Sequence, residues 1–130
     1  MGRLLTLKKR IGASGTLKTI ATNSYNEIGQ VTTKNIGGIE DQSLDYNIRG
    51  WLRGVNRSNL EAGIMASKFA YELAYDNVTG KLNADYGTAQ YNGNISGMMW
   101  RSFGDHENRK YNFTYDTVYQ PPIIRTLFQR

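Results

Sequence analysis

Two stretches of the sequence share one pattern: YNEIGQV over residues 25–31 and YNIRGWL over residues 46–52. Each begins with Tyr and Asn and continues with two variable residues, a Gly, one further residue and an aliphatic residue. Looser versions follow later in the chain. The tyrosines that precede Asn or Asp in this way are Tyr25, Tyr46, Tyr75, Tyr91 and Tyr115. A recurring unit favours a repeat architecture, and it governs how the other features are interpreted.

The unit has the chemistry of a β-hairpin turn. The side chain of Asn or Asp can hydrogen-bond the backbone ahead of it and start a turn. A following glycine can take a positive φ, which residues with a Cβ resist. The next aliphatic residue then begins the return strand. The predicted turn glycines are Gly29, Gly50, Gly80 and Gly93, and the aliphatic residues after them are Val31, Leu52, Leu82 and Ile95.

Alternating aromatic residues predict strands before several of these turns. Phe69, Tyr71, Leu73 and Tyr75 share one side of FAYELAYD, and YNFTYD over residues 111–116 repeats the alternation. We expect the aromatic side of these strands to pack. Other predicted strands are LLTLKKRI and TLKTIATNSY joined at Gly12–Gly15, QVTTKNI ending at Gly37 and Gly38, and QYNGNISGMMW as one long strand with a bend at a glycine.

Two segments depart from the pattern. Residues 56–68 place Leu60 and Ile64 at helical spacing, but Gly63 interrupts them, so we expect a loop with at most one helical turn. The last segment, VYQPPIIRTLFQR, has two consecutive prolines where a turn glycine is expected. This segment is therefore predicted to diverge from the repeat.

Composition narrows the class of protein further. The chain has 130 residues, no Cys and one His, so disulfides, thiolate metal sites and a Cys nucleophile are excluded. Abundant Tyr and Gly with a modest apolar fraction of 39% favour an all-β fold with tight turns. The sequence has no apolar run long enough to predict a membrane span, and no signal peptide is evident at its start. Localisation is left open.

Positive charge is concentrated at the front of the chain, within a net charge of +5. Arg3, Lys8, Lys9, Arg10 and Lys18 all precede the first acidic residue in the sequence. We interpret this segment as a solvated basic strand and turn. The alternative is a surface for phosphates or sulfated sugars.

Tryptophan and arginine positions each allow two interpretations. Trp51 and Trp100 follow glycines and are interpreted as sheet packing, with a sugar-stacking platform as the alternative. A row of arginines at a spacing of four is interpreted as the surface of a hairpin that pairs with nearby acids, and no nucleic-acid partner is expected. The row is Arg49, Arg53 and Arg57, and the acids are Asp41 and Asp45.

The sequence predicts no catalytic, cofactor or metal site. Glu72 and Asp76 are expected on the side of their strand that faces away from the aromatic row, but a chain with eleven acidic residues offers such pairs by chance. His106 stands between Asp105 and Glu107 in a turn-rich stretch without a second His or any Cys, which makes a poor metal ligand set. We predict that the protein is not an enzyme.

The ordered motifs resemble the YD repeat of the RHS (rearrangement hot spot) proteins, especially Bacteroidetes-type members. The motifs that carry the resemblance are GRLL, YNEIGQV, LDYNIRGWL, FAYELAYD, QYNGNISGMMWRS and YNFTYD. The resemblance covers residues 2–116, so we predict a repeat region over residues 1–116, truncated at both ends, and a divergent tail over residues 117–130. GRLL is similar to the second half of a repeat.

The resemblance implies an all-β fold in which antiparallel hairpins form a twisted sheet ribbon, part of a larger β-shell. In RHS proteins such a shell encloses a C-terminal toxin or effector, and some YD repeats are associated with carbohydrate binding. The expected function is that of a non-enzymatic wall segment whose partners are neighbouring repeats of a longer parent chain and a toxin cargo. The alternative is a carbohydrate- or polyanion-binding β module at the cell surface, using Lys8, Lys9, Arg10, Trp51 and Trp100.

Overall fold

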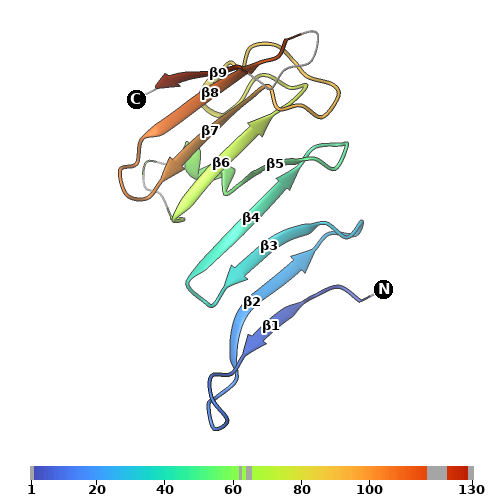
Figure 1. Cartoon of the computed structure of the whole chain (residues 1–130), viewed down its shortest axis with the longest axis vertical. Helices are drawn as coiled ribbons and strands as arrows, with labels where there is room; N and C mark the ends of the chain where they lie inside the picture. Colours follow the sequence, from blue (N-terminus) through green and yellow to red (C-terminus); the bar gives the residue numbers. More distant parts are fainter. Residues whose placement is uncertain (1, 62, 64–65, 117–122, 129–130) are drawn as a thin grey trace. The chain divides into compact units, whose positions relative to one another are not determined.

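The protein is all-β, as the sequence predicts, in a computed structural model that describes residues 2–61, 63, 66–116 and 123–128 (Figure 1). The chain divides into two compact units, Met1–Leu44 and Asp45–Arg130. Within each unit, strands that are consecutive in the sequence pair antiparallel with one another. Antiparallel neighbours joined by short turns form a meander, which is the arrangement that repeated hairpins produce.

The first unit contains a meander of four strands. They are β1 (Thr6–Lys9), β2 (Lys18–Tyr25), β3 (Val31–Ile36) and β4 (Glu40–Tyr46), the last of which crosses into the second unit. The loop between β1 and β2 includes Gly12 and Gly15, and the turn between β3 and β4 contains Gly37 and Gly38, both with positive φ. These hairpins confirm the strands predicted for this part of the sequence.

The described residues of the second unit form a meander of five strands and two short 3-10 helices. The strands are β5 (Leu52–Val55), β6 (Phe69–Ala74), β7 (Gly97–Ser102), β8 (Asn108–Thr114) and β9 (Ile123–Phe128). The helices are η1 (Arg57–Leu60) and η2 (Lys81–Asn83). The single turn of η1 confirms the prediction for residues 56–68 as far as they are described. The predicted tail lies partly outside the described residues, and its described part contains β9.

The two matching stretches, YNEIGQV and YNIRGWL, adopt the same turn. In the first turn, Gly29 N donates to Asn26 O, Asn26 N donates to Gln30 O, and Asn26 Oδ1 accepts from Gln30 N. In the second turn, Gly50 N donates to Asn47 O. The equivalent bonds around it join Asn47 N to Trp51 O and Trp51 N to Asn47 Oδ1. Both glycines have positive φ, 88° and 82°, so the predicted hairpin turns are confirmed here.

The later turns differ from the prediction. Gly80 has φ −99°, and Leu82 lies exposed in η2 instead of beginning a return strand. Gly93 does have a positive φ, 93°, but the following strand begins only at Gly97, so QYNGNISGMMW is not one long strand. The reason is tertiary: residues 76–96 leave the sheet, form a short hairpin with Tyr86 N bonded to Val78 O, and fold onto one face of β6 and β7.

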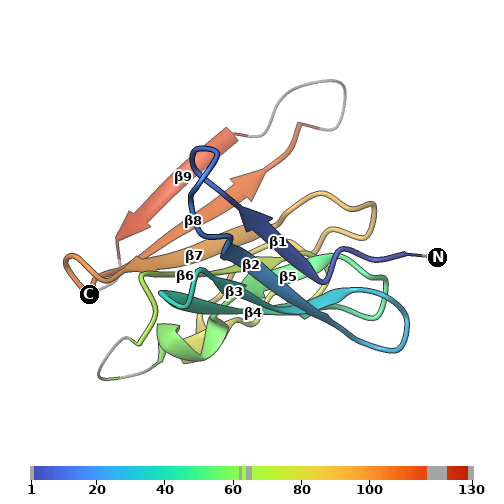
Figure 2. The ribbon, with the colours of Figure 1, turned by 90° about the horizontal axis from the view of Figure 1, so that it is seen from below.

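The core of the second unit lies under this returning segment. Its buried members are Leu60, Ala70, Ala74, Ala84, Tyr86 and Met99. Figure 2 shows η1 against the same side of the sheet. The alternation along β6 thus buries the alanine and glutamate row, whereas Phe69 on the aromatic row is 42% exposed. The packed side of these strands is the one opposite to the side predicted from the aromatic residues.

No helix among the described residues is long and apolar enough to cross a membrane.

Adjacent methionines on β7 test which face is packed. Met99 is fully buried in the core, and Met98 lies half-buried on the opposite face. We expect Met99→Ala to lower the free energy of unfolding by about 2–4 kcal/mol because it leaves a cavity, and Met98→Ala to cost less than half of that. Urea denaturation followed by circular dichroism measures both. Equal losses would show that the aromatic side is packed as tightly as the core side, contrary to this assignment.

Candidate functional site

Three motif tyrosines make the same long-range contact. In each, the phenol donates a hydrogen bond to the backbone carbonyl of an aliphatic residue 20 to 23 positions earlier. The pairs are Tyr25 with Leu4 at 2.7 Å, Tyr75 with Leu52 at 3.0 Å and Tyr115 with Ile95 at 2.7 Å. A phenol between two strands can satisfy its polar end in this way while its ring packs.

The three acceptors occupy one position in the motif. Each is the aliphatic residue two places after a glycine, and the glycines are Gly2, Gly50 and Gly93. A motif tyrosine is therefore bonded to the return segment of an earlier motif. We call these contacts the tyrosine links. They show that the aromatic residue and the glycine–aliphatic pair, which the sequence analysis treated as parts of one turn, also connect successive turns.

The other two motif tyrosines differ from these. Tyr46 ends β4 and is half-buried, and Tyr91 lies in the loop before β7 with 69% of its surface exposed. The prediction that Tyr91 packs like the other motif residues is not supported by this position. Its turn is the shortened version of the motif, in which Gly93 follows after a single residue.

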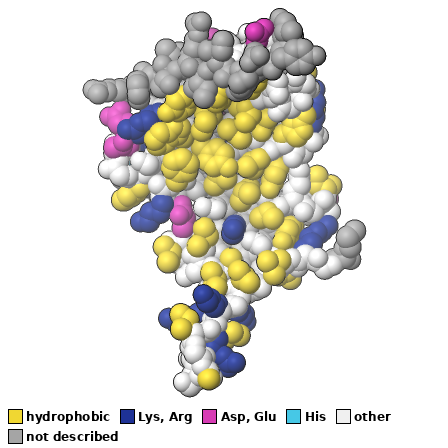
Figure 3. Space-filling view, in the orientation of Figure 1, with side chains coloured by type: hydrophobic (Ala, Val, Ile, Leu, Met, Phe, Trp, Pro, Cys, Tyr) yellow, Lys and Arg dark blue, Asp and Glu magenta, His cyan; other side chains and the backbone are white. Residues whose placement is uncertain are grey.

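The aromatic side of β5–β8 is a continuous half-buried surface, which we call the aromatic face. It consists of Val55, Phe69, Tyr71, Leu73, Met98, Trp100 and Tyr111, as the strand register places them. Ring centroids of Phe69 and Trp100 are 5.7 Å apart. Figure 3 shows hydrophobic side chains gathered over these strands. A part-exposed apolar surface of this kind is a candidate for contact with another surface.

Both tryptophans carry an arginine over the ring. The Arg49 guanidinium lies 5.3 Å from the Trp51 ring centre, and that of Arg109 lies 4.8 Å from Trp100. Trp51 also contacts Tyr75 at a centroid distance of 5.2 Å. These contacts place the tryptophans in sheet packing, the interpretation preferred from the sequence, and use part of the ring surface that a sugar would need.

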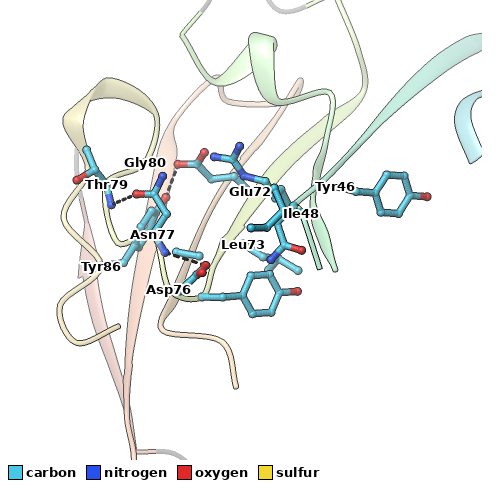
Figure 4. Close-up of a pocket in the computed structure, with 13 residues that line it drawn as sticks. Tyr46, Ile48, Glu72, Leu73, Asp76, Asn77, Thr79, Gly80 and Tyr86 are labelled. Atoms are coloured by element: carbon cyan, nitrogen blue, oxygen red, sulfur yellow. Dashed lines mark hydrogen bonds between the residues drawn. The ribbon is translucent and has the colours of Figure 1, made fainter. Parts of the chain in front are cut away.

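A buried carboxylate organises the opposite, covered side of the sheet. Glu72 is 2% exposed, and Figure 4 shows it at the junction of several segments. Its Oε1 accepts from Tyr86 OH at 2.6 Å and from Lys81 N at 2.7 Å. Its Oε2 accepts from Arg57 Nε and Nη2, at 3.2 and 3.1 Å. Four donors match the acceptor capacity of a carboxylate, so the ion is fully satisfied where it is buried.

The prediction for the arginine row is confirmed for Arg57 with Asp45 and is wrong for Asp41, which accepts a hydrogen bond from Asn35 instead. None of the ion pairs found among the described residues involves Arg53. Arg57 reaches Asp45 as well as Glu72, and Arg49 pairs with Asp76. The hydrogen bond from Arg49 holds the pKa of the Asp76 carboxyl below its usual range. Burial, followed by the hydrogen bond to Glu72, raises the pKa of the Tyr86 phenol, so this phenol stays protonated well into alkaline pH.

Glu72 and Asp76 both line a hollow of about 310 Å³ in the second unit (Figure 4). Gly80 and Tyr86 belong to the same lining. Both carboxylates take part in the ion pairs described above. In Glu72 every acceptor position is also filled by a hydrogen bond. The geometry therefore suits a structural junction that holds residues 76–96 on the sheet, and Gly80 is required there because a Cβ would overlap Glu72 Oε1 and the Tyr86 ring.

The remaining sequence candidates lie elsewhere. Lys8, Lys9 and Arg10 are exposed along β1 and the loop after it. His106 has φ 59° and its ring meets that of Phe103 edge-on at 5.2 Å. Among the described residues no group of acids and histidines is arranged to hold a metal ion.

Comparison with protein-family models and with curated proteins gave no match for this chain.

A tyrosine pair tests the energetic value of a tyrosine link. Tyr75→Phe removes the hydroxyl that bonds Leu52 O and keeps the ring, so we expect a loss of about 1 kcal/mol in the free energy of unfolding. Tyr91→Phe is the matched control at an exposed phenol and is expected to leave stability unchanged. Thermal and urea denaturation measure both. Indistinguishable variants would contradict the role of the link.

A glycine pair tests the Glu72 junction. Gly80→Ala is expected to lower the free energy of unfolding by about 1–3 kcal/mol, since the new methyl group must displace Glu72 or Tyr86. Gly104→Ala is the control, because its Cβ would meet only Ser102 Oγ at 3.9 Å. If Gly80→Ala were as stable as the native chain, residues 76–96 would not be seated on Glu72.

Proposed function

We propose that this protein is a non-enzymatic wall segment of an RHS-type repeat shell. In this proposal the hairpins act by geometry: they add to neighbouring hairpins of a longer parent chain and help to separate a toxin or effector cargo from its surroundings. The support comes from the antiparallel meanders, the identical turns at the two YN–G motifs and the tyrosine links. Repeats that stack only on their neighbours build such walls.

The observation that carries the proposal is the absence of a core in the first unit. None of its described residues, 2–44, is buried. Outside the loop that joins β1 to β2, several large aliphatic side chains of this unit are exposed to solvent: Leu4, Leu5, Leu7, Ile20, Ile28 and Ile39. In a single-layer sheet, strand pairing satisfies the backbone hydrogen bonds, but the side chains on each face are shielded from water only by contact with another surface. Neighbouring turns of a spiral ribbon supply that surface.

The aromatic face of the second unit supports the same role. Its rings pack among themselves yet remain part exposed, and the returning segment covers the opposite side of the sheet. A face of this composition fits against another sheet or a cargo domain. Carbohydrate binding through Trp51 and Trp100 has less support, since each ring is already stacked with an arginine.

The isolated chain tests the proposal through its association. We expect it to self-associate, because the aromatic face has no cover within the described part of the chain, and size-exclusion chromatography with light scattering measures this. Phe69→Lys places a charge on the aromatic face and is expected to reduce association. Ile48→Lys changes an equally apolar, exposed residue in a turn and is expected to leave association unchanged.

A monomeric chain with a cooperative melt would contradict the wall role, and so would equal effects of the two substitutions. The family part of the proposal has a separate check. DNA on either side of the coding sequence should encode further Tyr–Asp/Asn and Gly–aliphatic repeats in some reading frame.

A further inference from the structure

The loop that joins β1 to β2 combines cations with exposed aliphatic side chains. In this loop Ile11 is 82% exposed and Leu17 is 56% exposed, and the residues between them are small or polar. Lys8, Lys9 and Arg10 precede or open the loop, and Lys18 follows it. We call residues 8–18 the basic tip. Figure 3 shows blue and yellow side chains interspersed over this hairpin.

The charge of the basic tip is not balanced within the hairpin. Lys9 lies directly opposite Lys18 in the strand register. Like charges in this position destabilise an antiparallel pair. The tip contains no acidic residue, and none of the ion pairs found among the described residues involves it. An arrangement that costs stability and leaves four cations in water favours an anionic partner.

A shallow hollow adds an apolar component to this charge. Its volume is about 400 Å³. Its lining comes from both strands and from the loop, and it consists of Lys9, Ile11, Gly15, Thr16, Lys18 and Ile20. Two ammonium groups thus flank two isoleucines on one side of the hairpin. A partner that fits this surface must offer negative charge and an apolar phase next to each other.

We propose that the basic tip docks on the surface of an anionic lipid bilayer. Nucleic acids and sulfated sugars would engage the lysines but leave Ile11 and Leu17 in water. A bilayer engages both, because aliphatic side chains enter the boundary between headgroups and acyl chains while lysines remain at the level of the lipid phosphates. This role goes beyond the wall function and does not depend on the RHS assignment.

The opposite end of the same unit provides an internal comparison. Ile28, in the turn between β2 and β3, is 77% exposed, close to the value for Ile11. Its neighbour Glu27 is acidic, and no lysine or arginine lies within three residues of Ile28 in the sequence. The guanidinium of Arg3 lies beside Gly29 of this turn. The turn is therefore a site of similar apolar exposure with one arginine and an adjacent acid, in place of the four cations of the basic tip.

A single label tests insertion directly, since the chain has no native cysteine. Ile11→Cys is labelled with a polarity-sensitive fluorophore and mixed with phosphatidylcholine vesicles, with or without phosphatidylserine. We expect a blue shift only with phosphatidylserine, and its reversal by added salt. The same label at Ile28→Cys is expected to show no shift. A shift of equal size at both sites, or at neither, overturns the proposal.

Two substitutions then separate charge from apolar contact in vesicle co-sedimentation. Lys9→Glu faces Lys18 and removes a like-charge pair, so the hairpin is retained while the tip loses two units of positive charge. We expect vesicle binding to weaken by roughly tenfold or more. Lys34→Glu makes the same charge change at an exposed position of β3 and is expected to change binding by less than about twofold.

The contribution of apolar contact is tested with the double variant Ile11→Ser/Leu17→Ser, and Ile28→Ser is the control. We expect the paired variant to bind phosphatidylserine vesicles several-fold more weakly than the control while keeping its affinity for heparin. Full vesicle binding by the paired variant would mean that charge alone acts, and it would overturn the proposal in favour of a general polyanion site. Circular dichroism of each variant verifies that the sheet is retained.

Discussion

The tyrosine link is the interaction on which the repeat arrangement depends. A hairpin turn sets the path of the chain over a few residues only, and the phenol adds a bond to a carbonyl 20 or more residues away at the end of a strand pair that the backbone already joins. Each bond contributes about 1 kcal/mol after the exchange with water. Tyr25, Tyr75 and Tyr115 use the same atoms, the phenol hydroxyl and a backbone carbonyl. The same small stabilising contribution therefore recurs along the chain with each link.

The two turns that the sequence predicted best are those whose bonds all lie within the motif. In YNEIGQV and YNIRGWL, the Asn side chain and the Gly φ are determined by neighbours in the chain, so pattern and structure agree. The turns at Gly80 and Gly93 depend on residues 76–96 as a whole. There, contacts with Glu72 and Tyr86 outweigh the local preference for a tight hairpin, which no short pattern expresses.

The aromatic row was the wrong guide to the packed side for a related reason. Large rings suggest a core, yet Ala70 and Ala74 mark the face that another segment approaches most closely, since small side chains leave room for it. The sequence predicts Glu72, between them, on the side of the strand that faces away from the aromatic row. Its burial becomes possible only because Arg57 of η1 converges on it with Tyr86 and the Lys81 amide of the returning segment. The alternation of Ala70 and Ala74 with Glu72 was the feature of the sequence that could have predicted the packed side.

The returning segment also shows what the repeat can tolerate. Between Tyr75 and Ile95 the tight turn is replaced by an excursion of about twenty residues that builds the core of the second unit. Both ends of the excursion keep their links, Tyr75 to Leu52 and Ile95 to Tyr115. Insertions between strands are cheap when the strands on either side retain their partners. The links are therefore retained at both ends of a connection that has acquired a second role, the formation of the core.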